Sequence, residues 1–175
     1  MRQALFAAMV LAAAALGPGA AFAQQHAQNP LDAIPDKMPF NVPYGPPISL
    51  AQAQAAIQAT MEDATRRGWP EDIAVVGPSG DLVAFVRMDG AQLASIAIAQ
   101  HKARAAARYR RPTVIFENAV QKGGLNIILS LDDVIASRGG IPLIADGKLI
   151  GAIGCSGGTG SQDEAICKVG AATVK

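Results

Sequence analysis

The chain has 175 residues, enough for one folded domain with appendages. Half of its residues are hydrophobic and 17% are charged, which excludes a chain that is disordered throughout. Aromatic residues make up only 5%, which argues against a nucleic-acid surface built from stacking rings. The formal net charge is +1, so no global field attracts DNA or an anionic membrane. Any basic function must therefore be local.

The first 23 residues are typical of a secretory signal peptide. Arg2 supplies the positive charge, residues 4–16 form an apolar run, and Ala21-Phe22-Ala23 has the small-x-small pattern of a cleavage site. The apolar run is short for a membrane span, which makes an uncleaved anchor the weaker alternative. We expect cleavage after Ala23 and export, most simply to a bacterial periplasm. Cleavage removes one of 15 basic residues and no acidic one, leaving 14 of each and no reason to expect a membrane or nucleic-acid partner.

Residues 24–48 are predicted to form an extended arm ahead of the domain, which we place at 49–175. The arm holds six of the eleven prolines, which fix φ and remove backbone donors. Phe40 and Tyr44 are the side chains expected to hold the arm on the domain or on a neighbouring subunit. His26 lies in the arm and is more typical of a solvated tail than of a ligand.

Apolar periodicity predicts a helix over 50–67, with Ser49 as N-cap and Gly68 just past its end. Two short apolar runs at 73–76 and 82–86 surround a Gly/Pro/Ser/Asp turn, which indicates a β-hairpin. A second, alanine-rich helix is predicted from about residue 91 to residue 109, before Pro112.

The second helix is apolar on two sides. One side, expected to pack on the sheet, consists of residues at helical spacing: Ile96, Ala99, Ala103 and Ala106. Nearly opposite lies His101, with small or aliphatic neighbours: Ala94, Ala97, Ile98 and Ala105. A helix that is apolar on both sides is usually covered on both, here by a partner subunit or a flat apolar ligand. His101 is accordingly either a surface or interface histidine, or a ligand to a bound group.

Residues 113–140 show no clear pattern, and we expect a mobile lid or an edge region there. The adjacent acids Asp132 and Asp133 are typical of a turn or a helix start and do not form an acid/base or metal set. A second hairpin is predicted over 140–153, because Asp146-Gly147 between apolar runs is a strong two-residue turn signal. Ser161 with Glu164 is the capping box expected to open a final helix.

The glycine-rich stretch 154–160 lies between a strand and a helix, a geometry that binds anions through backbone N–H groups. It lacks the P-loop and dinucleotide patterns, so the glycines are more typical of a close strand-to-helix crossing. Cys155 and Cys167 are the two cysteines. Export permits a disulfide between them, but two small buried thiols are the favoured interpretation. The sequence has no C-x-x-C pair, which excludes covalent c-type haem.

Several motifs together resemble the GlcG/HbpS-like family of haem-binding or haem-degrading domains. They are GDLVAFVRMDGA at 80–91, the helix with Ser95, Ala99 and Lys102-Ala103, GGIPL at 139–143, and IGAIGCSGG at 150–158 with Asp163. The likeness covers about residues 49–173; the chain departs from it at Cys155, where an aliphatic residue is usual, and in its Pro-rich arm. The resemblance implies a single α+β domain, with helices packed on an antiparallel sheet of about five strands, often assembled into homo-oligomers.

The resemblance also implies haem, bound without a covalent link. Our own inference from this sequence places the iron on His101. Cations for the propionates would come from Lys102, Arg104 and Arg108, and a second axial ligand from Met88 or His26. Haem breakdown would need only bound iron with an open coordination position and a reductant. Because no nucleophile–base pair is evident, binding is favoured over turnover.

Two alternatives remain open. In the first, Arg87, Lys102 and the loop Ser156, Gly157 and Gly158 hold a small carboxylate in an accessory or sensor module. In the second, the outer side of the helix with His101 is a subunit interface in a scaffold without ligand.

Overall fold

The computed structural model describes residues 33–38 and 40–175, and one compact unit spans Met38–Lys175. The predicted signal peptide and His26 lie outside the described residues. In the described part of the chain, no helix has both the length and the apolar character needed to cross a membrane.

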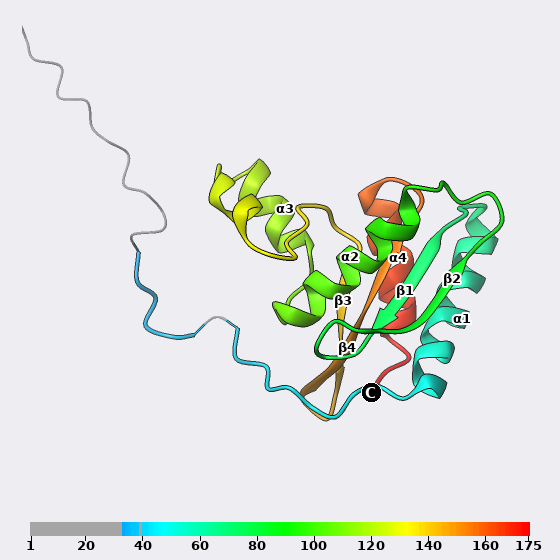
Figure 1. The fold of residues 1–175 in the computed structure, drawn as a ribbon, viewed down its shortest axis with the longest axis horizontal. Coiled ribbons are helices and arrows are strands. Elements are labelled where there is room, and N and C mark those ends of the chain that lie inside the picture. The colour runs from blue at the N-terminus through cyan, green and yellow to red at the C-terminus, as the bar shows by residue number, and fades with distance from the viewer. Residues whose placement is uncertain (1–32, 39) are drawn as a thin grey trace, which may run out of the picture. The chain divides into compact units, whose positions relative to one another are not determined.

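The compact unit is an antiparallel sheet between two layers of helices (Figure 1). Its strands are β1 (Asp72–Val76), β2 (Leu82–Arg87), β3 (Gly140–Ala145) and β4 (Lys148–Ser156), in the order β2-β1-β4-β3. α1 (Leu50–Arg67) and α4 (Gly160–Ala171) pack on one face, and α2 (Ser95–Arg108) packs on the other. The predicted α+β class is confirmed. The predicted strand number is wrong, because the described residues form four strands rather than about five.

The arm replaces a fifth strand along a short stretch. β1 ends opposite Ala152, and beyond that point the arm runs along β4 instead. Gly45 donates to the Leu149 carbonyl and Leu149 donates to the Pro43 carbonyl, both at 2.8 Å. The ladder between the arm and β4 is limited to one parallel bridge, Tyr44 with Leu149, because proline removes the donors that a longer ladder needs.

Both predicted hairpins and the first helix are confirmed. Ser49 caps α1 in a capping box with Gln52, and Gly68 ends it at φ 68°. β1 pairs with β2, and β3 pairs with β4 around Asp146-Gly147, where both residues have positive φ. These local signals decide the structure because Gly68 and Asp146-Gly147 adopt positive φ, and the Ser49 side chain accepts an otherwise unpaired N–H at the start of the helix.

α2 packs unusually close to the sheet. Ala99, Ala103 and Ala106 are fully buried against it, as their spacing predicts, whereas Ile96 is only partly buried. A Cβ on Gly154 of β4 would lie 2.1 Å from the Ala99 carbonyl oxygen, so only glycine fits there. The alanine content of α2 is therefore explained by this close approach.

Three local predictions are wrong. α2 begins at Ser95 rather than near residue 91. The cap of α4 is Thr159 with Gln162, not Ser161 with Glu164, because this earlier capping box starts the helix two residues sooner. Cys155 and Cys167 form a disulfide rather than two thiols, because β4 and α4 bring their Cα atoms to 5.8 Å.

Residues 113–140 contain more regular structure than the sequence indicates. α3 (Val114–Gln121) and the 3-10 helix η2 (Asn126–Ser130) fold in this segment. The two ends of the segment are joined to each other: Gly140 N–H donates to Thr113 Oγ1, and Arg138 pairs with Glu117 at 2.6 Å. Arg138 also pairs with Glu164 of α4 at 3.5 Å, which ties this end to the domain. The hydrogen bond from Arg138 lowers the pKa of Glu117. The mobility expected for this segment stays a prediction.

Candidate functional site

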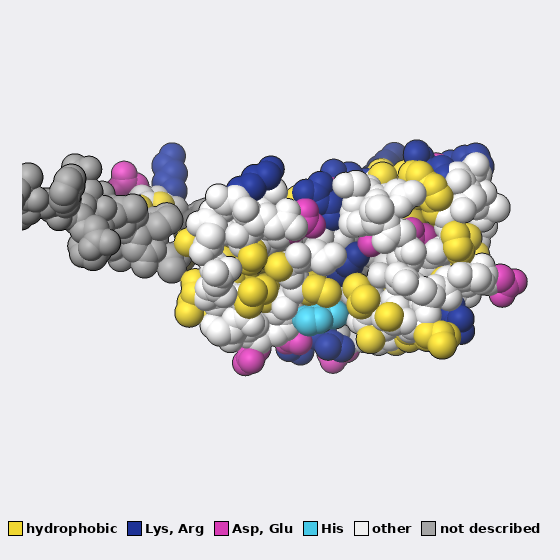
Figure 2. All heavy atoms as spheres, turned by 90° about the horizontal axis from the view of Figure 1, so that it is seen from above, with side chains coloured by type: hydrophobic (Ala, Val, Ile, Leu, Met, Phe, Trp, Pro, Cys, Tyr) yellow, Lys and Arg dark blue, Asp and Glu magenta, His cyan; other side chains and the backbone are white. Residues whose placement is uncertain are grey.

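The outer face of α2 carries an exposed apolar stripe. Ala94, Ala97, Ile98 and His101 follow one another at helical spacing, and the nearby Leu93 is 71% exposed. His101 is half-buried in this stripe and is the one histidine among the described residues. Figure 2 shows apolar side chains on both sides of the histidine. This surface can accept a flat apolar molecule against an imidazole.

Two arginines border the stripe toward the C-terminal end of α2. Arg104 and Arg108 both pair with Asp133, which follows η2 and has φ 59°. Arg108 Nε also donates to the Ser79 carbonyl at 2.7 Å. Their side chains remain 39% and 46% exposed, so both guanidinium groups can still reach an anion in solvent.

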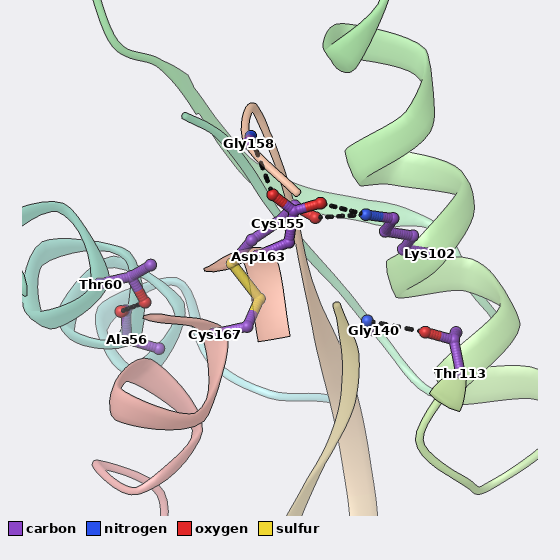
Figure 3. Close-up of a disulfide and its surroundings, with 9 residues drawn as sticks. All are labelled: Ala56, Thr60, Lys102, Thr113, Gly140, Cys155, Gly158, Asp163 and Cys167. Atoms are coloured by element: carbon purple, nitrogen blue, oxygen red, sulfur yellow. Dashed lines mark hydrogen bonds and ion pairs between the residues drawn. A yellow bond between two sulfur atoms is a disulfide. The ribbon is translucent and has the colours of Figure 1, made fainter. Parts of the chain in front are cut away.

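Lys102 does not lie with Arg104 and Arg108, the two arginines with which the sequence analysis grouped it as a partner of the haem propionates. It is 1% exposed, and its Nζ is 2.6 Å from Asp163 Oδ2 and 3.1 Å from the Cys155 carbonyl oxygen. Figure 3 shows Lys102 reaching from α2 to Asp163 on α4, beside the disulfide. Lys102 thus connects the two helix layers and presents no charge on the outer face of α2.

Two buried acids were missed in the sequence, and one of them, Glu71, adjoins this ion pair. Glu71 and Asp72 are fully buried, and in the described part of the chain their carboxylate oxygens have no hydrogen-bond partner. Burial, and then the negative charge of Asp163, raises the pKa of Glu71 to about 8. Burial also raises the pKa of Asp72, against the attraction of Arg87.

The glycine-rich loop at the end of β4 is engaged internally. Ser156 Oγ donates to Ser95 Oγ at 2.9 Å, and Gly158 N–H donates to Asp163 Oδ1 at 3.0 Å. These polar groups of the loop therefore bond to buried side chains of α2 and α4. Arg87 is largely exposed and donates to the Ala91 carbonyl at 3.2 Å.

The structure does not bring Met88 and His101 together. Met88 packs on the core cluster that α1 and α4 cover, on the opposite sheet face from α2. Within residues 33–38 and 40–175, no group of three or more His, Cys, Asp or Glu side chains is placed to hold a metal ion.

Residues 48–172 match the family model described as haem degrading protein HbpS-like. This chain belongs to the HbpS-like family. Among curated relatives, protein GlcG of Escherichia coli K12 is 38% identical over 109 residues, which are 62% of this chain and 81% of GlcG. The GlcG/HbpS-like resemblance stated from the motifs is confirmed.

Several solved structures share the fold described above. ORFY from Klebsiella pneumoniae superposes with a TM-score of 0.69 at 29% identity, covering 78% of this chain and 97% of that one. The PduOC:heme complex gives 0.66 at 30% identity, covering 74% and 96%. A double mutant of HbpS from Streptomyces reticuli gives 0.67 at 27% identity, covering 82% and 98%. One of these relatives was thus solved with haem.

Proposed function

We propose that the mature protein binds haem on the outer face of α2, with His101 as iron ligand. The observation that carries the proposal is the exposed apolar stripe with a half-buried histidine in it. The description of the HbpS-like family and the existence of a PduOC:heme complex support haem as the ligand class. An imidazole nitrogen is a common ligand to haem iron.

The residues around His101 fit a flat ring with two acidic arms. Ala94 and Ala97 are small and exposed, so a macrocycle can approach the helix without steric conflict. Arg104 and Arg108 are positioned on the same helix to pair with propionates, which guanidinium groups bind strongly. Lys102 takes no part in this site, because its charge is enclosed with Asp163. Bound haem would supply redox chemistry, and the chain's own residues would hold and orient it.

A haem titration of residues 24–175, followed by the Soret band, tests the iron ligand. We expect a saturable shifted band that His101→Ala loses or weakens at least tenfold, about 1.4 kcal/mol of binding free energy. Gln100→Ala is the matched control, since Gln100 is partly exposed one residue away. A band that is unchanged in His101→Ala would discard this ligand, and no saturable band at micromolar haem would discard haem binding.

The two arginines give a separate prediction. Arg104→Ala with Arg108→Ala should raise the dissociation constant for haem, because each change removes a cation from the rim of the site. The position of the Soret band should stay the same, since the iron ligand is unchanged. Unaltered affinity in the double variant would place the propionates elsewhere.

Haem breakdown is the second part of the proposal, supported by the family's description as haem degrading. Oxidative breakdown of haem by dioxygen consumes electrons, so the test supplies an external reductant. We expect the Soret band of the complex to decay under ascorbate and air faster than that of free haem at equal concentration. Equal decay rates would leave a binding protein without this activity.

Export to the periplasm is the third part of the proposal. The first 23 residues have the signal-peptide pattern. The buried Cys155–Cys167 disulfide supports it, because such bonds persist mainly in oxidising compartments. Amino-terminal sequencing of protein from the periplasmic fraction should give Gln24. Recovery of the intact first 23 residues in the cytoplasm would contradict export.

A homo-oligomer is also part of the proposal, and the same apolar face is available to it. Light scattering of the mature protein with and without haem distinguishes the two uses. If subunits cover the stripe, Ile98→Glu should dissociate the oligomer. If haem covers it, Ile98→Glu should weaken haem binding and leave the subunit number unchanged.

A further inference from the structure

A closed acid–base cluster lies where the start of β1 meets α2 and α4. Its members are Glu71, Lys102 and Asp163, which are 0%, 1% and 2% exposed. One Asp163 oxygen pairs with Lys102 Nζ at 2.6 Å, and the other accepts the Gly158 N–H at 3.0 Å. Each Asp163 oxygen thus has a donor. Neither oxygen of Glu71 has a partner among the described residues.

The charge count in this cluster does not balance if both acids are ionised. Two carboxylates and one ammonium leave a net negative charge in a site closed to solvent, which is strongly unfavourable. Two ionised carboxylates also cannot hydrogen-bond to each other, because neither has a donor. A single proton on Glu71 removes both problems, since it cancels the excess charge and supplies the donor.

Among the described residues, the other charged groups that act on Glu71 do not supply a second cation. α2 contributes Lys102 and α4 contributes Asp163, while the next residue along the chain is Asp72 of β1, whose charge raises the Glu71 pKa further. Arg87 of β2 acts on Asp72.

The glycine-rich loop closes the site above Glu71. A Cβ on Gly157 would lie 2.9 Å from Glu71 Cδ and 2.3 Å from the Pro70 carbonyl oxygen, so the loop backbone packs directly on the acid. Any change in the charge of Glu71 therefore acts on this loop and, through Gly158 and Asp163, on the start of α4.

We propose that Glu71 is a neutral carboxylic acid in the folded protein and donates a hydrogen bond to Asp163, so that losing this proton destabilises the packing of the loop Ser156–Gly158 on Glu71. The cluster is thus a pH-sensitive device under the loop Ser156–Gly158, independent of the haem proposal.

The direction of the pH effect follows from the raised pKa. The ordinary value for this carboxyl is 4.5 and the value in the folded protein is about 8. The folded state therefore binds the proton more tightly, and the contribution of Glu71 to stability falls as pH rises between these two values. Above about pH 8 the contribution is constant.

Glu71→Gln tests the proposal, because the amide keeps the shape and the donor but cannot titrate. Between about pH 5 and about pH 9, the Tm of the unmodified protein should fall more than that of the variant. At the alkaline end the variant should be the more stable protein. Parallel pH profiles, or a variant destabilised equally at every pH, would overturn the proposal.

A second measurement needs no variant. The sequence contains four glutamates, Glu62, Glu71, Glu117 and Glu164, so selective carbon-13 labelling of glutamate carboxyls gives four NMR titrations. We expect one carboxyl signal to remain in its protonated position at about pH 6.5, well above the range of ordinary carboxyl groups. If all four signals titrate below about pH 6, Glu71 is ionised and the proposal fails.

Discussion

Lys102 is fully buried. Lysine is rarely buried unless its charge is paired, and here the partner is Asp163. Both side chains of the Lys102–Asp163 ion pair are buried, so removing one partner leaves a buried charge without compensation. We predict that Lys102→Met lowers the free energy of unfolding by about 3–5 kcal/mol. The double variant Lys102→Met/Asp163→Leu should lose less than the sum of the two single changes, as measured by denaturant unfolding. Simple additivity of the two losses would contradict this coupling.

The buried role of Lys102 could have been found in the sequence, whereas that of Glu71 could not. Lys102 adjoins Ala103 and lies three residues after Ala99, and both alanines were assigned to the side of the helix that faces the sheet. This spacing already predicts that Lys102 lies near the sheet and not on the outer face. His101 was placed on the opposite side by the same rule and lies there. Glu71 precedes a strand, where an acid is commonly solvated. The packing of α2, α4 and the loop at Gly157 encloses it, and the sequence does not show that packing.

The close packing of α2 on β4 gives a prediction at the level of the element. Gly154→Ala should destabilise the protein by about 1–3 kcal/mol, because the new methyl group would force the helix away from the sheet. Thermal unfolding compares it with Ala55→Ser on the exposed side of α1, which should change little. An unchanged Tm in Gly154→Ala would show that α2 and β4 are not packed this closely.

The disulfide between β4 and α4 gives a second prediction at this level. Its two cysteines are 12 residues apart, so the bond restricts a short loop of the unfolded chain. Cys155→Ala/Cys167→Ala should lower the free energy of unfolding by about 2–4 kcal/mol. Thiol titration of the denatured, unreduced protein should find no free thiol. Two reactive thiols per chain would support the interpretation made from the sequence instead.

The elements that were predicted correctly are specified by a few neighbouring residues. The features that were missed depend on more than one such short signal. Asp146-Gly147 and the Ser49 cap each specify their own backbone geometry. The cap of α4 was misplaced because Ser161 and Thr159 both satisfy the capping pattern, and the earlier one, Thr159 with Gln162, starts the helix. The disulfide depends on where two elements meet, which the cysteine spacing does not reveal.

At the scale of the whole molecule, the arm is part of the sheet and is more than an N-terminal tail. Besides the two bonds with Leu149, Ile48 N–H donates to the Ile150 carbonyl at 2.8 Å, and Phe40 lies over the Arg111 guanidinium. The burial of Arg111 at this contact lowers its pKa. The arm was expected to attach either to the domain or to another subunit; in the described structure, residues 40–48 contact their own domain.

The contacts of the arm predict the effect of removing it. A chain that begins at Ser49 loses three backbone hydrogen bonds to β4, which together contribute roughly 3 kcal/mol at about 1 kcal/mol each. It also exposes the unpaired backbone of Leu149 and Ile150, and unpaired strand edges promote association. We expect a lower Tm and concentration-dependent aggregation relative to residues 24–175. Tyr44→Phe is the matched control, since it removes only the bond from the phenol to the Arg108 carbonyl and leaves the edge covered. Equal Tm values for the long and short chains would mean that the arm does not hold the sheet in solution.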